Sequence, residues 1–152
     1  MYRLLALTLL LAPAALSAPP TPAASVKYRH AVMEALGGHM AATAMIVKGE
    51  SDRSQDLVMH ATALHDLSTS IASLFPDGTG PGAPGIETDA KAEIWTKKTE
   101  FAAAAKKLET ESAKLLEAAK KNDPVSLKAA LGATGGACGD CHDAFKVDED
   151  KH

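Results

Sequence analysis

Residues 123–145 read DPVSLKAALGATGGACGDCHDAF and give the clearest indication of the fold. Asp123 is a favoured helix-capping residue, and Pro124 suits the first helical position, where a missing N–H breaks no intrahelical bond. Inward positions then follow, mostly three or four residues apart, at Leu127, Leu131, Thr134, Cys138, Cys141, His142 and Phe145. This spacing predicts a helix with one buried face that includes both cysteines and a histidine.

Two earlier segments show the same spacing. The first spans 26–48 and stops at Gly49. The second starts at Ser51 or Ser54 and ends before Pro76, because proline does not continue a helix. Their predicted inward residues are Met33, Leu36, Met40, Thr43 and Val47 in the first, and Leu57, Ala61, Leu64, Ser68, Ile71 and Phe75 in the second.

A long loop separates the second segment from a third helical segment. Residues 76–86 read PDGTGPGAPGI, and four glycines and three prolines in this stretch exclude a helix or a central strand. Thr88 or Asp89 is predicted to cap the third helix, which runs to 121. Its predicted inward residues are Ile94, Phe101, Ala105, Leu108, Leu115 and Ala119.

The four segments together predict an all-α fold. β-branched residues never alternate as they do in a strand, and helices of about 20 residues with mostly short links form antiparallel four-helix bundles. Hydrophobic residues make up 46% of the 152 residues and aromatic residues only 4%, so the core is rich in alanine. A core of such small side chains suggests that the helices pack around something besides themselves.

The segment Cys138-Gly139-Asp140-Cys141-His142 is the C-x-x-C-H signature of covalent haem c attachment. Positions i and i+3 of a helix share a face, so both thiols can reach one edge of a porphyrin, and the histidine that follows can turn toward its metal. A thioredoxin-like redox pair needs a preceding strand, and a zinc site needs four ligands. Neither is indicated here, although chance occurrence of a short motif stays open.

The N-terminus predicts export. Residues 1–24 combine a charged start, an apolar run from Leu4 to Leu11, and small residues and prolines, which is typical of a signal peptide cleaved between 14 and 24. The bundle domain is then 25–152, and no stable membrane insertion of this mature chain is expected. The formal net charge of −3 argues against a nucleic-acid partner.

Several stretches together resemble the class II c-type cytochromes, the cytochrome c′ and cytochrome c-556 family. They are YRHAVMEALGGHMAATAMIVKGE (28–50), LFPDG (74–78), KAEIW (91–95) and LKAALGATGGACGDCHDAFK (127–146). The resemblance covers nearly the whole mature chain and implies a four-helix bundle with one covalent haem c near one end. It further implies that His142 is the proximal iron ligand, beside the attachment residues Cys138 and Cys141.

The resemblance places Met33 at the sixth coordination position. The chain looks closer to the low-spin c-556 branch, which implies a periplasmic electron carrier, not an enzyme, serving unidentified redox partner proteins as a monomer or homodimer. The alternative is a five-coordinate cytochrome c′ that binds NO or CO, with Met33 only packed over the haem. Arg29 is expected either to pair with a haem propionate or to be a surface charge. The histidines outside the motif are expected at the surface or its boundary: His30, His39, His60, His65 and His152.

Overall fold

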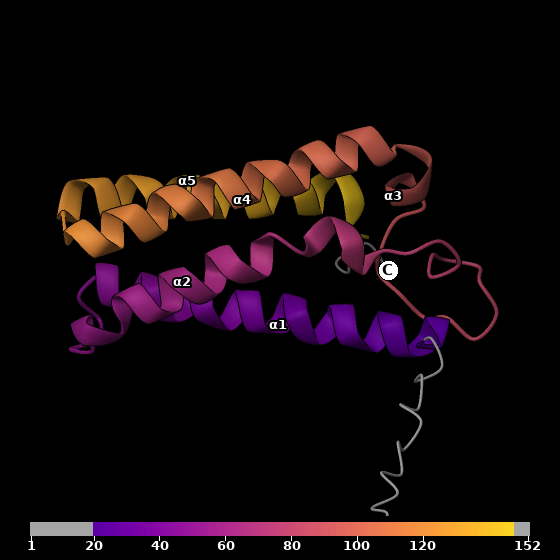
Figure 1. The fold of residues 1–152 in the computed structure, drawn as a ribbon, viewed down its shortest axis with the longest axis horizontal. Helices are drawn as coiled ribbons and strands as arrows, with labels where there is room; N and C mark the ends of the chain where they lie inside the picture. The colour runs from indigo at the N-terminus through magenta and orange to yellow at the C-terminus, as the bar shows by residue number, and fades with distance from the viewer. Residues whose placement is uncertain (1–19, 148–152) are drawn as a thin grey trace, which may run out of the picture.

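The computed structural model describes residues 20–147. Four long helices run antiparallel and form a bundle, which confirms the predicted fold class (Figure 1). Within the described residues there is no strand, only one isolated antiparallel bridge between Ala90 and Lys146. The elements are α1 (Pro22–Val47), η1 (Ser54–Asp56), α2 (Leu57–Ser68), η2 (Ile71–Leu74), α3 (Glu93–Thr96), α4 (Lys98–Lys121) and α5 (Pro124–Phe145).

The start of α5 and the end of α1 follow the sequence prediction. The Asp123 carboxylate accepts hydrogen bonds from the backbone N–H groups of Val125 and Ser126, and Pro124 occupies the first turn. Gly49 adopts φ +74°, a left-handed conformation that side chains disfavour, directly after the capping residue of α1. Both ends are therefore set by local chemistry that is legible in the sequence.

The first helix begins earlier than its predicted start at Val26. The helix α1 begins at Pro22, and the Thr21 hydroxyl caps it by accepting from the N–H of Ala24. Residues 1–19 of the predicted signal peptide lie outside the described residues. No helix among residues 20–147 is both long and apolar enough to cross a bilayer.

The third helix does not start at Thr88 or Asp89, so that prediction was wrong. The Thr88 hydroxyl accepts from the N–H of Ala90, two residues on, as in a turn. The next backbone groups bond to the end of α5: the N–H of Lys91 donates to Phe145 O at 2.8 Å, and Asp89 O accepts from Val147 N–H at 2.7 Å. Because these groups are committed to another segment, the helix cannot begin until α3.

The second predicted helix divides into two. α2 ends at Ser68, and the 3₁₀ helix η2 continues the same face. Hydroxyl side chains explain the break, because Thr69 and Ser70 donate to the carbonyls of Asp66 and Leu67 and compete with regular helix bonding. The inward-facing residues stay buried although the helix changes from α to 3₁₀ geometry, since Ile71 and Leu74 are 4% and 8% exposed.

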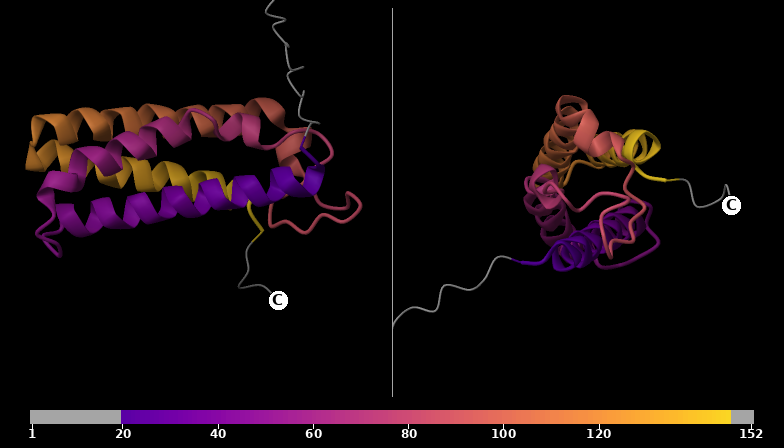
Figure 2. Two further views of the ribbon diagram at one scale, coloured as in Figure 1. Left: turned by 60° about the horizontal axis from the view of Figure 1, so that its bottom comes forward. Right: turned by 90° about the vertical axis from the view of Figure 1, so that its right-hand side faces the viewer.

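The helices pack in the order α1, α2, α4 and α5 around the bundle, as the end view in Figure 2 shows. Contacts between α1 and α5 are sparse compared with those of α4 with α5. The buried core is mostly leucine and alanine, with Phe101 and Phe145 in edge contact near one end. The side between α1 and α5 is thus the one that the helices leave open.

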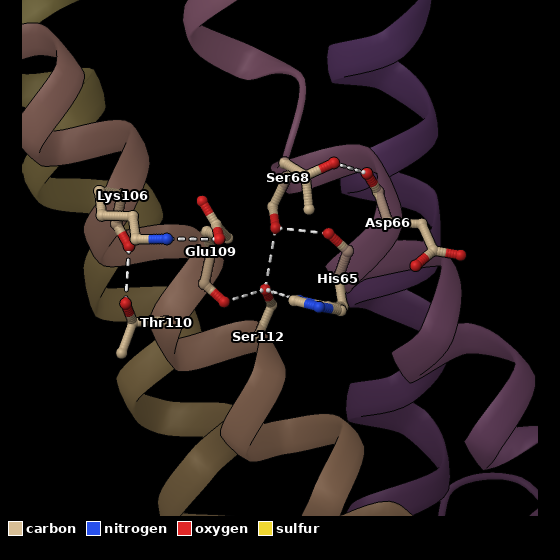
Figure 3. Close-up of polar contacts among 8 residues, drawn as sticks. His65, Asp66, Ser68, Lys106, Glu109, Thr110 and Ser112 are labelled. Carbon is tan, nitrogen blue, oxygen red and sulfur yellow. Dashed lines mark hydrogen bonds and ion pairs between the residues drawn. The ribbon is translucent and has the colours of Figure 1, made fainter.

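A small polar cluster joins α2 to α4 inside this core. The hydroxyl oxygens of Ser68 and Ser112 lie 3.0 Å apart, and His65 Nδ1 lies 3.4 Å from Ser112 Oγ. Figure 3 shows these three side chains pointing toward one another. The two hydroxyl protons are shared among three contacts, because the Ser68 hydroxyl can also donate to His65 O and the Ser112 hydroxyl to Glu109 O. Both serines are almost fully buried, and their mutual bond satisfies groups that would otherwise destabilise the core.

Candidate functional site

A cavity of about 740 Å³ opens between α1 and α5 at the end where α1 begins. This volume suits a large organic group rather than a single ion. The lining comes from all four long helices and from the segment after η2, and it is mainly apolar. Its lining residues include Val26, Arg29, Met33, Leu36, Met40, Leu64, Ile71, Phe75, Ile94, Phe101, Leu108, Cys138, Cys141, His142 and Phe145.

The C-x-x-C-H segment lies on the last two turns of α5 and borders this cavity. Cys138 and Cys141 are half-buried free thiols, and His142 is exposed at the cavity's edge. Burial raises the pKa of both thiols, which keeps them protonated. Partial desolvation of the ring and the nearby Lys146 cation lower the pKa of His142, which favours the neutral imidazole that binds metals.

Two lysines fix this end of α5 to its neighbours. Lys107 of α4 forms an ion pair with Asp140, inside the motif, at 2.6 Å. Lys91 Nζ donates to the carbonyl of Asp143 at 2.8 Å, next to His142. The motif therefore lies on a helix that is held from α4 and from the segment before α3.

The opposite wall of the cavity is formed by α1. Met33 and Met40 are half-buried and both border the cavity, two turns apart on one face. Met40 also approaches α5, because its terminal methyl lies 3.3 Å from where a Cβ of residue 135 would stand. A glycine at 135 therefore lets this methionine sit close to the helix that carries the cysteines.

Arg29 is 4% exposed, so the structure rejects the surface alternative for this residue. Its guanidinium donates to Thr79 Oγ1 at 2.8 Å, to Thr79 O at 2.9 Å and to Thr88 Oγ1 at 2.7 Å. The cation also lies 4.8 Å from the centre of the Phe75 ring and 5.7 Å from that of Trp95. Burial lowers the pKa of Arg29, but arginine stays charged in proteins.

The partners of Arg29 were not predicted. Thr79 and Thr88 lie on the segment between η2 and α3, which crosses one end of the bundle (Figure 2). Thr79 is only 1% exposed, although the glycine-rich sequence around it is typical of an exposed turn. Its burial could therefore be seen only in the folded chain. Arg29 thus anchors a loop to α1 beside the cavity.

The competing interpretations of the motif do not fit this geometry. In the described part of the chain, no three His, Cys, Asp or Glu side chains converge on a common metal position. Residues 20–147 form no strand that could precede a thioredoxin-like pair. The two thiols and the histidine instead face a cavity of the size and apolarity that a porphyrin requires.

The four-helix bundle and the C-x-x-C-H segment at its cavity together define the class of four-helix-bundle proteins with a covalently attached haem. The sequence profile of the family described as Cytochrome C′ matches residues 24–146, and the chain belongs to this family, whose members carry covalent haem c. The cytochrome c′ of Pararhodospirillum photometricum is 37% identical over 126 residues, covering 83% of this chain and 98% of the relative.

Two further similarities span both branches of the family. A cytochrome c-556 of Agrobacterium tumefaciens is 33% identical over 125 residues, covering 82% of this chain and 98% of the relative. A nitric oxide complex of a cytochrome c′ variant from Alcaligenes xylosoxidans superposes with a TM-score of 0.74 at 29% identity, covering 84% of this chain and 97% of that one. The family and cofactor expected from the sequence are thereby confirmed.

Proposed function

We propose that this chain is a periplasmic electron-transfer protein whose haem iron is held between His142 and Met33. The observation that carries the proposal is that Met33 on α1 borders the same cavity as Cys138, Cys141 and His142 on α5. The bound haem c supplies a one-electron Fe(III)/Fe(II) couple. Everything else needed for the reaction is positioning, which these two helices provide.

Each residue has a definite role in this proposal. The Cys138 and Cys141 thiols form the covalent attachments, and the neutral imidazole of His142 donates a nitrogen to the metal. The thioether of Met33 provides a soft, uncharged ligand that favours the reduced state. His142 and Met33 both lie on helices that the bundle holds, so a change of the iron's charge would require little rearrangement of these two residues.

Arg29 is proposed to stabilise an anionic group of the cofactor. Its hydrogen-bond acceptors Thr79 and Thr88 are neutral, and the guanidinium borders the cavity. These hydrogen bonds go to neutral groups and leave the positive charge unbalanced, whereas buried charges in proteins are usually paired. A propionate carboxylate at the cavity's edge would supply the balancing charge.

The coordination is tested by visible absorption of the oxidised, reduced and CO-treated reduced holoprotein. His142/Met33 ligation predicts a sharp low-spin spectrum that CO barely changes. Met33→Ala should convert the iron to high spin and admit CO, whereas the matched control Met40→Ala, on the same cavity wall, should stay low-spin. An unchanged low-spin spectrum in Met33→Ala would contradict ligation by Met33.

Covalent attachment has its own test. Replacing Cys138 and Cys141 together by serine should make the haem extractable with acidified acetone, because serine forms no thioether. Haem that stays with the chain after extraction would contradict attachment at these residues.

The second candidate function is binding of NO or CO at a five-coordinate iron. It is supported by the similarity to a cytochrome c′ that was solved with nitric oxide. In that case the wild-type spectrum is broad and high-spin, and CO alters it strongly without any substitution. The same measurement therefore distinguishes the two functions.

Export is proposed from residues 1–24, and N-terminal sequencing of protein from the periplasmic fraction tests it. A mature chain that starts between 15 and 25 is expected. A start at Met1 would contradict cleavage.

A further inference from the structure

Residues 88–91, here called the strap, connect the two helices that face each other across the haem cavity. On one side, Thr88 Oγ1 accepts a hydrogen bond from the Arg29 guanidinium of α1 at 2.7 Å. On the other side, backbone groups of the strap bond to the end of α5, at 2.8 Å to Phe145 O and at 2.7 Å to the N–H of Val147. The first three residues of the strap border the cavity.

The strap lies where the two helices make little contact of their own. Contacts between α1 and α5 are sparse, and the cavity opens between these helices. Figure 2 shows the segment between η2 and α3, which contains the strap, crossing this end of the bundle. The strap is therefore a direct hydrogen-bonded connection between α1 and α5 at the mouth of the cavity.

Each anchor of the strap lies about one helical turn from a proposed iron ligand. Met33 follows Arg29 by four residues on α1, and His142 precedes Phe145 by three residues on α5. The backbone hydrogen bonds of a helix keep such neighbouring positions in a fixed relation. A displacement of either anchor therefore displaces the ligand beside it.

We propose that Thr88 is a positioning residue that keeps the sixth coordination position closed. This inference rests on the proposed ligation of the iron by His142 and Met33. When the strap is bonded at both ends, it holds α1 and α5 at the separation that both ligands need. When the bond between Thr88 and Arg29 opens, the two walls of the cavity move apart, the Met33 thioether leaves the iron, and an external ligand enters.

The other partner of Arg29 does not hold the strap in this way. Arg29 donates to the hydroxyl and to the carbonyl of Thr79, but three glycines lie between Thr79 and Thr88. Glycine backbone is conformationally permissive, so a fixed Thr79 places little constraint on the strap. Thr79→Val is therefore a matched control, because it removes a hydroxyl that Arg29 binds and leaves both anchors of the strap intact.

Imidazole binding to the oxidised holoprotein measures how often the sixth position opens. At saturating imidazole the binding rate no longer rises with concentration, because the departure of Met33 limits it. Thr88→Val keeps the size of the side chain and should raise this limiting rate about tenfold, while the iron at rest stays low-spin because Met33 rebinds. A tenfold change in rate corresponds to about 1.4 kcal/mol, and a hydrogen bond to a charged group contributes at least that much. Thr88→Ser, which keeps the hydroxyl, and Thr79→Val should both retain the wild-type rate.

Hydrogen exchange tests the strap independently of the iron. The backbone N–H groups of Lys91 and Val147 form the bonds between the strap and α5. Both should exchange faster in Thr88→Val than in the wild type and in Thr88→Ser, whereas the amide of Leu115 in the core of α4 should not change.

The outcomes separate the strap from the proposed coordination. A limiting rate and an exchange pattern that Thr88→Val leaves unchanged, or a rate that Thr79→Val raises equally, would overturn the role of Thr88. A high-spin spectrum of the wild type would instead refute ligation by Met33, and the exchange at Lys91 and Val147 would then still decide whether Thr88 holds the strap.

Discussion

Replacing Arg29 by alanine should release the segment between η2 and α3 from the bundle. The guanidinium holds Thr79 and Thr88 through three hydrogen bonds of 2.7–2.9 Å and contacts the rings of Phe75 and Trp95. Alanine removes all of these contacts at once. The backbone carbonyl of Thr79 loses its side-chain donor, whereas the Thr79 hydroxyl still donates to Pro76 O.

The magnitude follows from these contacts. Hydrogen bonds to a charged group stabilise by about 1.5–3 kcal/mol each, and the ring contacts add about 1 kcal/mol. These terms are not additive, and the variant no longer has to desolvate a guanidinium, which offsets part of the loss. We expect a net decrease of about 3 kcal/mol in the free energy of unfolding.

Urea unfolding of the oxidised holoprotein, followed by far-UV circular dichroism, measures this decrease. The matched control is Arg53→Ala, because Arg53 forms an ion pair with Asp56 at the surface, 62% exposed. Such a pair contributes about 0.5 kcal/mol or less. Faster proteolytic cleavage within 76–92 should accompany the loss in Arg29→Ala only. If the two variants lose equal stability, Arg29 does not anchor the segment.

Two further predictions use the same unfolding measurement. Asp123→Ala should destabilise the protein at neutral pH. Hydrogen bonds from the hydroxyl and N–H of Ser126 lower the pKa of the Asp123 carboxyl. The stability that this carboxylate contributes is therefore complete above its pKa in the unfolded chain and is lost as the pH falls through its lower pKa in the folded chain. The difference in unfolding free energy between wild type and Asp123→Ala should narrow in acid, and a difference that widens in acid would contradict this. Asp123→Asn, which caps the helix without a charge, should show no such narrowing. Gly80→Ala should cost about 1 kcal/mol, because its Cβ would stand 3.0 Å from the Trp95 ring, whereas Gly132→Ala, with open space around it, should stabilise α5 by up to about 1 kcal/mol; equal effects would argue against the clash.

Local signals in the sequence predicted the parts of the fold that local chemistry controls. The capping of α5 by Asp123 and the end of α1 at Gly49 depend on residues within one turn, and both were predicted correctly. The predicted inward positions are buried or half-buried, with Leu64 and Leu115 at 2% and 0% exposed, and the exception is His142, which is exposed at the edge of the cavity. Spacing predicts these faces because any helix that packs in a bundle must bury one stripe of residues.

The errors lie where distant segments meet. Thr88 has the residue type of a helix cap, but its hydroxyl accepts from Arg29, 59 residues away, and its neighbours bond to the end of α5. His39 Nδ1 lies 2.9 Å from His60 Nδ1, and this contact likewise depends on how α1 packs on α2. Contacts between residues that are distant in the chain produce no periodic pattern in a single sequence. The predicted start of the third helix at Thr88 or Asp89 was wrong for that reason.

The position of Arg29 also bears on how the haem site is built. Arg29 and Met33 are one turn apart on α1, so the anchor of the loop and the proposed sixth ligand share a rigid support. A substitution that loosens the loop leaves α1 itself held by its packing on α2. Stability and iron coordination should therefore separate: Arg29→Ala unfolds at lower urea concentration yet keeps the low-spin spectrum, and Met33→Ala changes the spectrum with a smaller loss of stability, because Met33 is only half-buried.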